Sequence, residues 1–458
     1  VTWHLEFPFW WDDSHENHHI ERKGENFFWV HHQLTVRFDA ERLSNHLDPV
    51  DELHWDDVIH EGFAPHTMYK YGGYFPSRPD HVHFEDVDGV ARVRDMLILE
   101  SRIRDAIAHG YITAKDGSTI SIRDAHGIDV LGDVIESSTY SPNPQYYGAL
   151  HNTAHVMLGR QGDPHGKFDL PPGVLEHFET ATRDPAFFRL HKYMDNIFKE
   201  HKDKLPPYTA DELKYENVEI EEVVVDELVT FFEDFEFDLS NALDTSDNVA
   251  DVSVKAHVNR LNHEPFHYNI HYHADHDDKV TVRVYLTPKN DENGIALDIN
   301  ENRWGAILID TFWAEVQAGT HSIRRSGHDS NVVIPDSTSF SELIREADEA
   351  VESNSEMHIE SGRSCGHPER LLLPKGNTEG LEFWLNVYVT SGDDGAQDDL
   401  HVDAHGGTHG YCGVRGEKYP DKRPMGFPFE RRIPDLRVIK DLPNFYGKTV
   451  LVKHKDQH

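Results

Sequence analysis

Residues 150–158 read Leu-His-Asn-Thr-Ala-His-Val-Met-Leu, and this stretch places His151 and His155 four residues apart. Residues four apart in an α-helix lie on one face, one turn from each other, so both imidazoles can reach one metal ion. His191 lies in a second predicted helix, on an apolar stripe that begins at Phe187. The sequence therefore predicts that two neighbouring helices bring three histidines to one metal site.

A second group of histidines precedes this stretch. His31 falls on the helical stripe of Phe27, whereas His32 is rotated by about 100° and is expected nearer the edge of the helix. His4 belongs to a short helical fragment that Pro8 ends. A single buried histidine is more often a core residue bonded to a neighbour. Five inward histidines on four helices would leave several imidazoles without partners, which favours a metal site.

The ligand type limits the metal. All candidate ligands are neutral imidazoles, which suit copper, zinc, iron or nickel. The repeated Glu-x-x-His pattern of di-iron bundles is not found in the predicted helices. Three imidazoles leave open positions on each metal, so two such metals that face each other can hold one diatomic ligand.

The hydrophobic pattern divides the chain in two. Helical periodicity dominates the first part, Pro206 and Pro207 interrupt it, and a period of two follows. The predicted helices span 27–38, 90–109, 146–158 and 185–201, and the predicted strands span 218–225, 252–258, 280–286 and 381–389. We therefore predict a multidomain α+β protein, with a four-helix bundle over residues 1–205 and an antiparallel β-sandwich over residues 206–458.

Composition excludes some partners. The chain has 458 residues, of which 38% are hydrophobic, so packed cores are expected. The formal charge is 44 − 82 = −38, which repels nucleic-acid phosphates and anionic lipid surfaces. No apolar run approaches the length of a membrane span. We expect neither nucleic acid nor a membrane as a partner.

Cys365 and Cys412 are the only cysteines. They can form one disulfide or remain two free thiols, and we favour the disulfide. A bond across such a loop stabilises the fold by roughly 4 kcal/mol in the chain-entropy model. It implies an oxidising compartment.

Two other histidine patterns resemble metal motifs. Residues 263–267 read His-Glu-Pro-Phe-His, but Pro265 prevents the helix that the zinc motif H-E-x-x-H requires. We expect a turn or a polar strand face there. His401, His405 and His409 lie in a glycine-containing loop, where weak metal binding is the most we expect.

Long stretches of the chain resemble one family, the arthropod hemocyanins of the crustacean type. They are FFWVHHQLTVRFDAERLSN (27–45), KYGGYFP (70–76), HFEDVDGV (83–90), YYGALHNTAHVMLGRQGDPHGKFDLPPGVLEHFETATRDP (146–185), AFFRLHKYMDNIF (186–198) and CGVRGEKYPDKRPMGFPFERRIP (412–434). The resemblance covers essentially the whole chain. It implies a type-3 dicopper centre, with two copper ions that bind O2 reversibly as bridging peroxide.

The resemblance also assigns residues. It implies that His4 and His31 bind copper A and that His151, His155 and His191 bind copper B. Glu136 matches an acidic residue held near the copper pair. Asn152 is similar to a residue that orients a water in related dicopper oxidases, where the water accepts a phenol proton.

The resemblance further implies a secreted oxygen carrier of the hemolymph that works as a subunit of a hexamer or larger assembly. We expect an oxygen carrier rather than an enzyme, with latent phenoloxidase activity at the same site as an alternative. A copper-free storage protein of the same fold is a second alternative, against which the retained histidines argue. Compared with the family, the sequence is expected to lack the N-terminal helical domain and the first copper A histidine.

Overall fold

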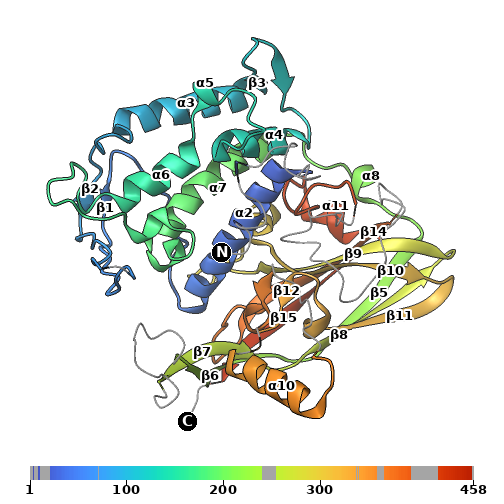
Figure 1. The fold of residues 1–458 in the computed structure, drawn as a ribbon. Coiled ribbons are helices and arrows are strands. Elements are labelled where there is room, and N and C mark those ends of the chain that lie inside the picture. Colours follow the sequence, from blue (N-terminus) through green and yellow to red (C-terminus); the bar gives the residue numbers. More distant parts are fainter. Residues whose placement is uncertain are drawn as a thin grey trace.

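The chain forms a helical part and a β-sheet part that lie side by side (Figure 1). The computed structural model describes residues 4, 9–10, 21–70, 72–239, 254–336, 338, 340–357, 366–392 and 421–455. The helical part comes first in the sequence, and strands dominate from Val218 onward. This arrangement is the predicted combination of a helical domain and a sandwich.

Six helices make up most of the helical part. They are α2 (Lys23–Ser44), α3 (Val93–His109), α4 (Gly127–Glu136), α5 (Pro144–Tyr147), α6 (Leu150–Gly159) and α7 (Ala186–Lys204). Between them lie the antiparallel pairs β1 (Val58–Ile59) with β2 (Val82–His83) and β3 (Tyr111–Thr113) with β4 (Thr119–Ser121), and the 3-10 turns η1 (Val174–Glu176) and η2 (Ala181–Arg183).

The helix predicted over 146–158 is in fact two helices, because α5 ends before Gly148 and α6 begins after it. Gly148 adopts a φ of 67°, which only glycine reaches readily, and this conformation ends α5. The break turns the chain so that α6 starts at Leu150, directly before His151.

Two glycines let α2 and α4 approach each other closely. A Cβ atom on Gly132 would lie 2.0 Å from the carbonyl oxygen of Gly24, far inside any tolerable contact. A Cβ atom on Gly24 would lie 1.9 Å from the carbonyl oxygen of Asp129. This close crossing brings the start of α2 against α4, the helix that ends at Glu136.

In the described residues, the sandwich consists of a six-stranded and a three-stranded sheet. Their strands are β5 (Val218–Val225), β6 (Leu228–Asp238), β7 (Lys255–His263), β8 (His267–Ala274), β9 (Asp278–Pro288), β10 (Ile307–Val316), β11 (Gly319–Ser326), β14 (Leu381–Ser391) and β15 (Phe445–Lys455). The strand orders are β10-β9-β14-β15-β6-β7 and β11-β8-β5. All neighbours in these sheets are antiparallel except β15 and β6, which run parallel and place the last described strand beside an early one.

Smaller elements connect these strands. They are α8 (Ala210–Leu213), α9 (Ile299–Asn302), α10 (Phe340–Ser353), α11 (Leu436–Lys440), the parallel pair β12 (Val333–Ile334) and β13 (His367–Pro368), and the 3-10 turns η5 (Arg303–Gly305), η6 (Gly327–Asp329) and η7 (Glu369–Leu371).

Helix α2 joins the two parts of the molecule. The amide of Gln33 donates to the carbonyl of Ala306 and accepts from the backbone N–H of Leu308, each at 3.0 Å. One turn later, Arg37 donates to the carbonyls of Leu308 and Leu372. Helix α2 therefore packs one side against the sandwich and another side against the helical core.

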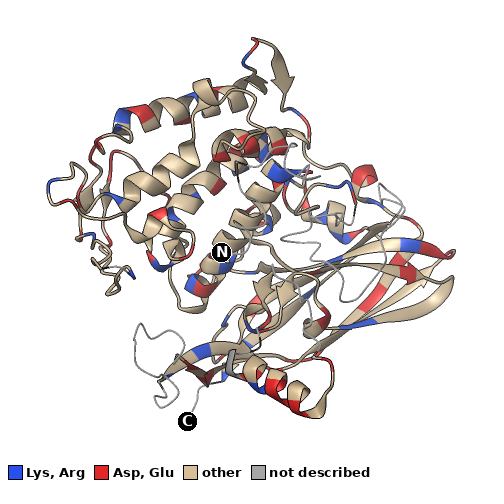
Figure 2. Ribbon diagram, viewed as in Figure 1, with Lys and Arg blue, Asp and Glu red and all other residues tan. Residues whose placement is uncertain are grey.

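Acidic and basic residues are interspersed along both parts of the molecule, as Figure 2 shows. Helix α10 carries several of the acidic residues on the sandwich side. Among the described residues, no helix combines the length and the apolar character needed to cross a bilayer.

Candidate metal centre

Four of the five predicted ligand histidines converge from three helices. One ring nitrogen from each of His31, His151 and His191 lies within 4.8 Å of the other two. The rings of His31 and His191 stack with their centres 4.6 Å apart. The Nε2 atoms of His155 and His191 are 3.1 Å apart. The tightest group thus combines one residue predicted for copper A with two predicted for copper B.

Backbone and side-chain oxygens orient three of these rings through Nδ1. His31 Nδ1 lies 2.7 Å from the carbonyl oxygen of Phe27, and His155 Nδ1 lies 2.8 Å from that of Leu175. His151 Nδ1 lies 3.0 Å from Oδ1 of Asn152. Since these oxygens only accept, each ring donates at Nδ1 and keeps a lone pair at Nε2. This is the arrangement of metal-binding histidines, whose second nitrogen is held by an outer partner.

The remaining ring nitrogens test whether a metal fits. Nε2 of His151 and Nδ1 of His191 are buried and have no hydrogen-bond partner in the described part of the chain. Buried polar atoms are rarely left in this state, because each lost hydrogen bond costs about 1–3 kcal/mol. A metal ion that accepts the Nε2 lone pair of His151 satisfies that atom, so the residues present fit a bound metal.

Burial keeps the cluster neutral. Burial lowers the pKa of His31 and of His155 to about 4, and it lowers those of His151 and His191 well below the usual range. Neighbouring imidazoles add to the effect at His151 and His191. Neutral imidazole is the form that binds metals, so all four side chains are ready to act as ligands at neutral pH.

His4 lines the same cavity as these histidines. The cavity has a volume of about 350 Å³, and apolar side chains such as Leu34 and Phe187 form much of its wall. The ring of His4 stacks on Phe178 with centres 5.2 Å apart. Burial, followed by the neighbouring His31, lowers the pKa of His4 to about 3. His4 is thus a fifth neutral imidazole on the cavity wall.

Asn152 and Glu136 connect the cluster to α4. The Asn152 amide donates to the backbone carbonyl of Glu136 at 2.9 Å, so this side chain is engaged at both its oxygen and its nitrogen. The carboxylate of Glu136 is buried and pairs with Lys23 at 2.5 Å. Glu136 therefore supports His151 through Asn152. No sequence pattern predicts Lys23 as the partner of Glu136, because the two residues lie 113 positions apart.

The expectation for His32 was wrong. Its side chain is as buried as that of His31, and its Nδ1 lies 2.8 Å from Oδ1 of Asp195. The reason is that α2 is enclosed on more than one side, because the sandwich covers the face that a single amphipathic stripe would leave in solvent. Sequence reasoning also missed Asp195 as a partner.

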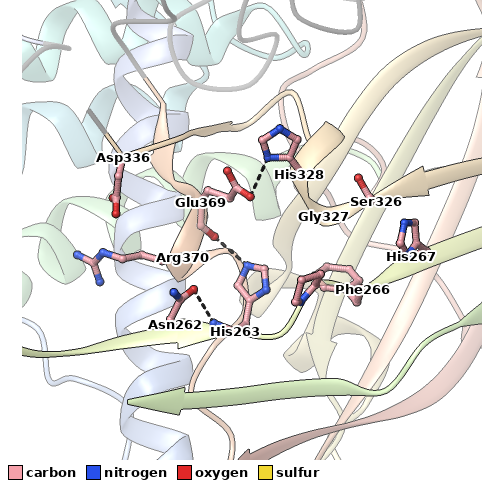
Figure 3. A pocket seen from close by; sticks show the side chains of 11 residues that line it. Asn262, His263, Phe266, His267, Ser326, Gly327, His328, Asp336, Glu369 and Arg370 are labelled. Carbon is pink, nitrogen blue, oxygen red and sulfur yellow. Dashed lines mark hydrogen bonds and ion pairs between the residues drawn. The ribbon is translucent and has the colours of Figure 1, made fainter. Parts of the chain in front are cut away.

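The H-E-x-x-H match forms a turn between two strands, as expected, and not the helix that the zinc motif requires. Strand β7 ends at His263 and β8 begins at His267, so a turn separates the two histidines. Figure 3 shows Phe266 between them, with His263 turned toward Glu369. Both ring nitrogens of His263 contact backbone carbonyls, at 2.9 and 3.0 Å. The predicted Cys365–Cys412 disulfide and the loop with His401, His405 and His409 lie outside the described residues.

A buried all-histidine cluster in a helical domain beside a β-sandwich defines a metalloprotein class. The protein-family model described as "Hemocyanin, copper containing domain" matches residues 1–198. The family model described as "Hemocyanin, ig-like domain" matches residues 207–454. The chain belongs to the hemocyanin family. The predicted family, fold class and copper cofactor are thereby confirmed, while the assignment of individual ligands stays a prediction.

Several relatives are similar over nearly the whole chain. Identity is 59% to the hemocyanin of Palinurus vulgaris, over 99% of this chain and 70% of the relative. It is 58% to the hemocyanin A chain of Panulirus interruptus, over 100% and 70%. It is 45% to pseudohemocyanin-2 of Homarus americanus, over 100% and 68%.

Two solved structures share the fold. A scorpion hemocyanin in its activated state superposes with a TM-score of 0.88 at 36% identity, over 99% of this chain and 72% of that one. A crustacean hemolymph prophenoloxidase superposes with a TM-score of 0.85 at 27% identity, over 99% and 68%. Of these two structures, the hemocyanin is the more similar.

Proposed function

We propose that this chain carries O2 between two copper ions, with His4 and His31 on one ion and His151, His155 and His191 on the other. The observation that carries the proposal is the 3.1 Å approach of His155 Nε2 to His191 Nε2, from rings with no carboxylate partner in the described part of the chain. When bound, the copper ions supply the reversible redox chemistry that O2 binding requires.

The side chains around the cluster keep it neutral and enclosed. The rings of Phe27 and Phe187 lie against the histidines, with centres 4.5 Å from His31 and 4.1 Å from His191. Among the described residues, Glu176 is the only acidic side chain that lines the cavity, and Arg160 holds its carboxylate at 3.0 Å. A largely apolar wall favours a small neutral ligand such as O2 over ions.

Copper titration with O2 as the probe tests this proposal. The chain should bind two copper ions and show an absorption band that appears with O2 and disappears when O2 is removed. Replacing His155 with Ala should remove one copper ion and the band, whereas the matched variant His263→Ala in the sandwich should keep both. Turnover of a catechol without reversible O2 binding would favour the phenoloxidase instead, and absence of copper binding would favour the storage protein.

We further propose three features that support such a carrier. Residues 1–205 and 206–458 are its two domains, with the border after α7 ends at Lys204. The chain is secreted into hemolymph, with Cys365 bonded to Cys412. It works as one subunit of a hexamer or multiple of hexamers, which the existence of A, B and C chains in Panulirus interruptus supports. Sedimentation and thiol titration of the denatured protein test assembly and disulfide.

A further inference from the structure

Three consecutive residues of α2 contact three different parts of the molecule. His31 faces the histidine cluster, His32 faces α7, and Gln33 bonds the start of β10 in the sandwich. Successive helical residues point about 100° apart, so one turn of α2 touches the metal centre, the second ligand helix and the sandwich at once.

Asp195 of α7 contacts both α2 and the sandwich part. It follows His191 on α7 by one helical turn, and its two carboxylate oxygens have different partners. Oδ1 lies 2.8 Å from Nδ1 of His32, and Oδ2 accepts from Nε1 of Trp304 at 2.7 Å. Trp304 belongs to η5, the turn that leads into β10. Asp195, His32 and Trp304 are exposed by only 3%, 3% and 6%.

We infer that Asp195 is a positioning residue that lets the sandwich fix the spacing of His31 and His191, and thereby the O2 affinity of the centre. This inference rests on the proposed O2 function. The bond from His32 to Asp195 ties α2 to α7 one residue and one turn away from the stacked rings of His31 and His191. The bond from Trp304 ties the same carboxylate to the sandwich.

The local packing leaves this carboxylate little freedom. The ring of His32 lies against Trp304 and Phe28, with centres 4.4 and 5.4 Å away. A buried charge-assisted pair of this kind is rigid, because its oxygens have no water to turn toward. A movement of η5 relative to the helices must therefore either carry Asp195 and α7 along or break a buried hydrogen bond.

Asp195→Asn and Trp304→Phe test this role. Asn turns one acceptor oxygen into an NH2 group that faces an N–H donor, while Phe removes the indole donor and keeps an aromatic ring. With copper fully loaded, Asp195→Asn should raise the half-saturating O2 pressure roughly tenfold, within the range of typical coupling energies between distinct sites. Trp304→Phe should raise it about fivefold, although the residue lies in the sandwich and outside the cavity.

A matched control separates positioning from stability. Asp421→Asn breaks an equally buried pair with Arg283, at 2.7 Å, that touches no histidine among the described residues. It should lower the unfolding midpoint and leave the O2 affinity unchanged. If Asp195→Asn does not fold, Trp304→Phe decides the question alone. A wild-type O2 affinity in Trp304→Phe overturns the inference, whereas a wild-type chain that binds no O2 overturns the proposed function.

Discussion

The Nε2 atoms of His155 and His191 lie 3.1 Å apart, although the residues sit on different helices and neither ring meets a carboxylate in the described structure. Nδ1 of His155 already donates to Leu175, so its Nε2 atom carries a lone pair. Two nitrogens on one tetrahedral ion with bonds of about 2.0–2.1 Å lie about 3.3–3.4 Å apart. The helices therefore hold this pair at a spacing that suits a shared metal ion.

Asn152 should matter to copper through His151. Replacing it with Leu removes the acceptor for His151 Nδ1 and the donor to the Glu136 carbonyl. The affinity for the copper ion that His151 is proposed to bind should fall roughly 10- to 100-fold, as it does when other outer partners of metal ligands are lost. Copper titration by equilibrium dialysis measures this change. Asn143→Leu, which alters an asparagine that caps α5, is the control and should leave copper affinity as it is.

The copper-free chain should lose stability on acidification because of its buried imidazoles. His31 has a pKa of about 4 in the folded chain and about 6.5 when unfolded. Between pH 4 and pH 6.5, His31 is therefore protonated in the unfolded state but neutral in the folded state. Its contribution to the free energy of unfolding is fully present above pH 6.5 and falls as the pH drops toward 4. The contribution of His31 is roughly 3 kcal/mol.

Urea unfolding of the copper-free chain at pH 7 and pH 4.5 provides the measurement. His31→Gln lacks this titration, so its unfolding free energy should decline less between the two pH values than that of the wild type. An equal decline in both proteins would show that His31 is not held neutral by the fold.

The sequence predicted the ligand helices better than their surroundings. The stripes around His151, His155 and His191 are regular because each helix has one apolar face against the core, and such a face leaves a clear period. Helix α2 is buried against both α7 and the sandwich, so its pattern marked His31 as inward and wrongly placed His32 at the edge.

Other features were not found from the sequence. The α4 segment Gly-Ile-Asp-Val-Leu-Gly-Asp-Val-Ile-Glu has apolar residues at helical spacing, but it also contains two glycines, which disfavour a helix in isolation. Its close packing against α2 requires glycine at positions 24 and 132. The pair of Lys23 with Glu136 and that of His32 with Asp195 join residues 113 and 163 positions apart, which no periodicity can reveal.

The buried pair of Lys23 and Glu136 should be costly to break from one side only. Lys23→Met leaves a buried carboxylate without its cation and should destabilise the chain by about 3–5 kcal/mol. Adding Glu136→Leu removes that charge as well, so the double variant should recover most of the loss. Chemical unfolding of both variants measures the coupling. Independent, additive losses would mean that the two side chains do not depend on each other.

Gly132 should be highly sensitive to substitution. A Cβ atom there would lie 2.0 Å from the Gly24 carbonyl oxygen, and two backbone segments cannot yield as a flexible side chain can. Gly132→Ala should therefore push α4 away from α2 and destabilise the chain by about 3 kcal/mol, the upper range of overpacking. Because α4 ends at Glu136, whose carbonyl holds Asn152, copper affinity should fall with stability. Gly166→Ala is the matched control: its Cβ meets no atom within 4 Å, and its φ of 62° costs only about 1 kcal/mol. Calorimetry and copper titration of the two variants should separate them, and equal behaviour would show that the α2–α4 contact does not position the metal centre.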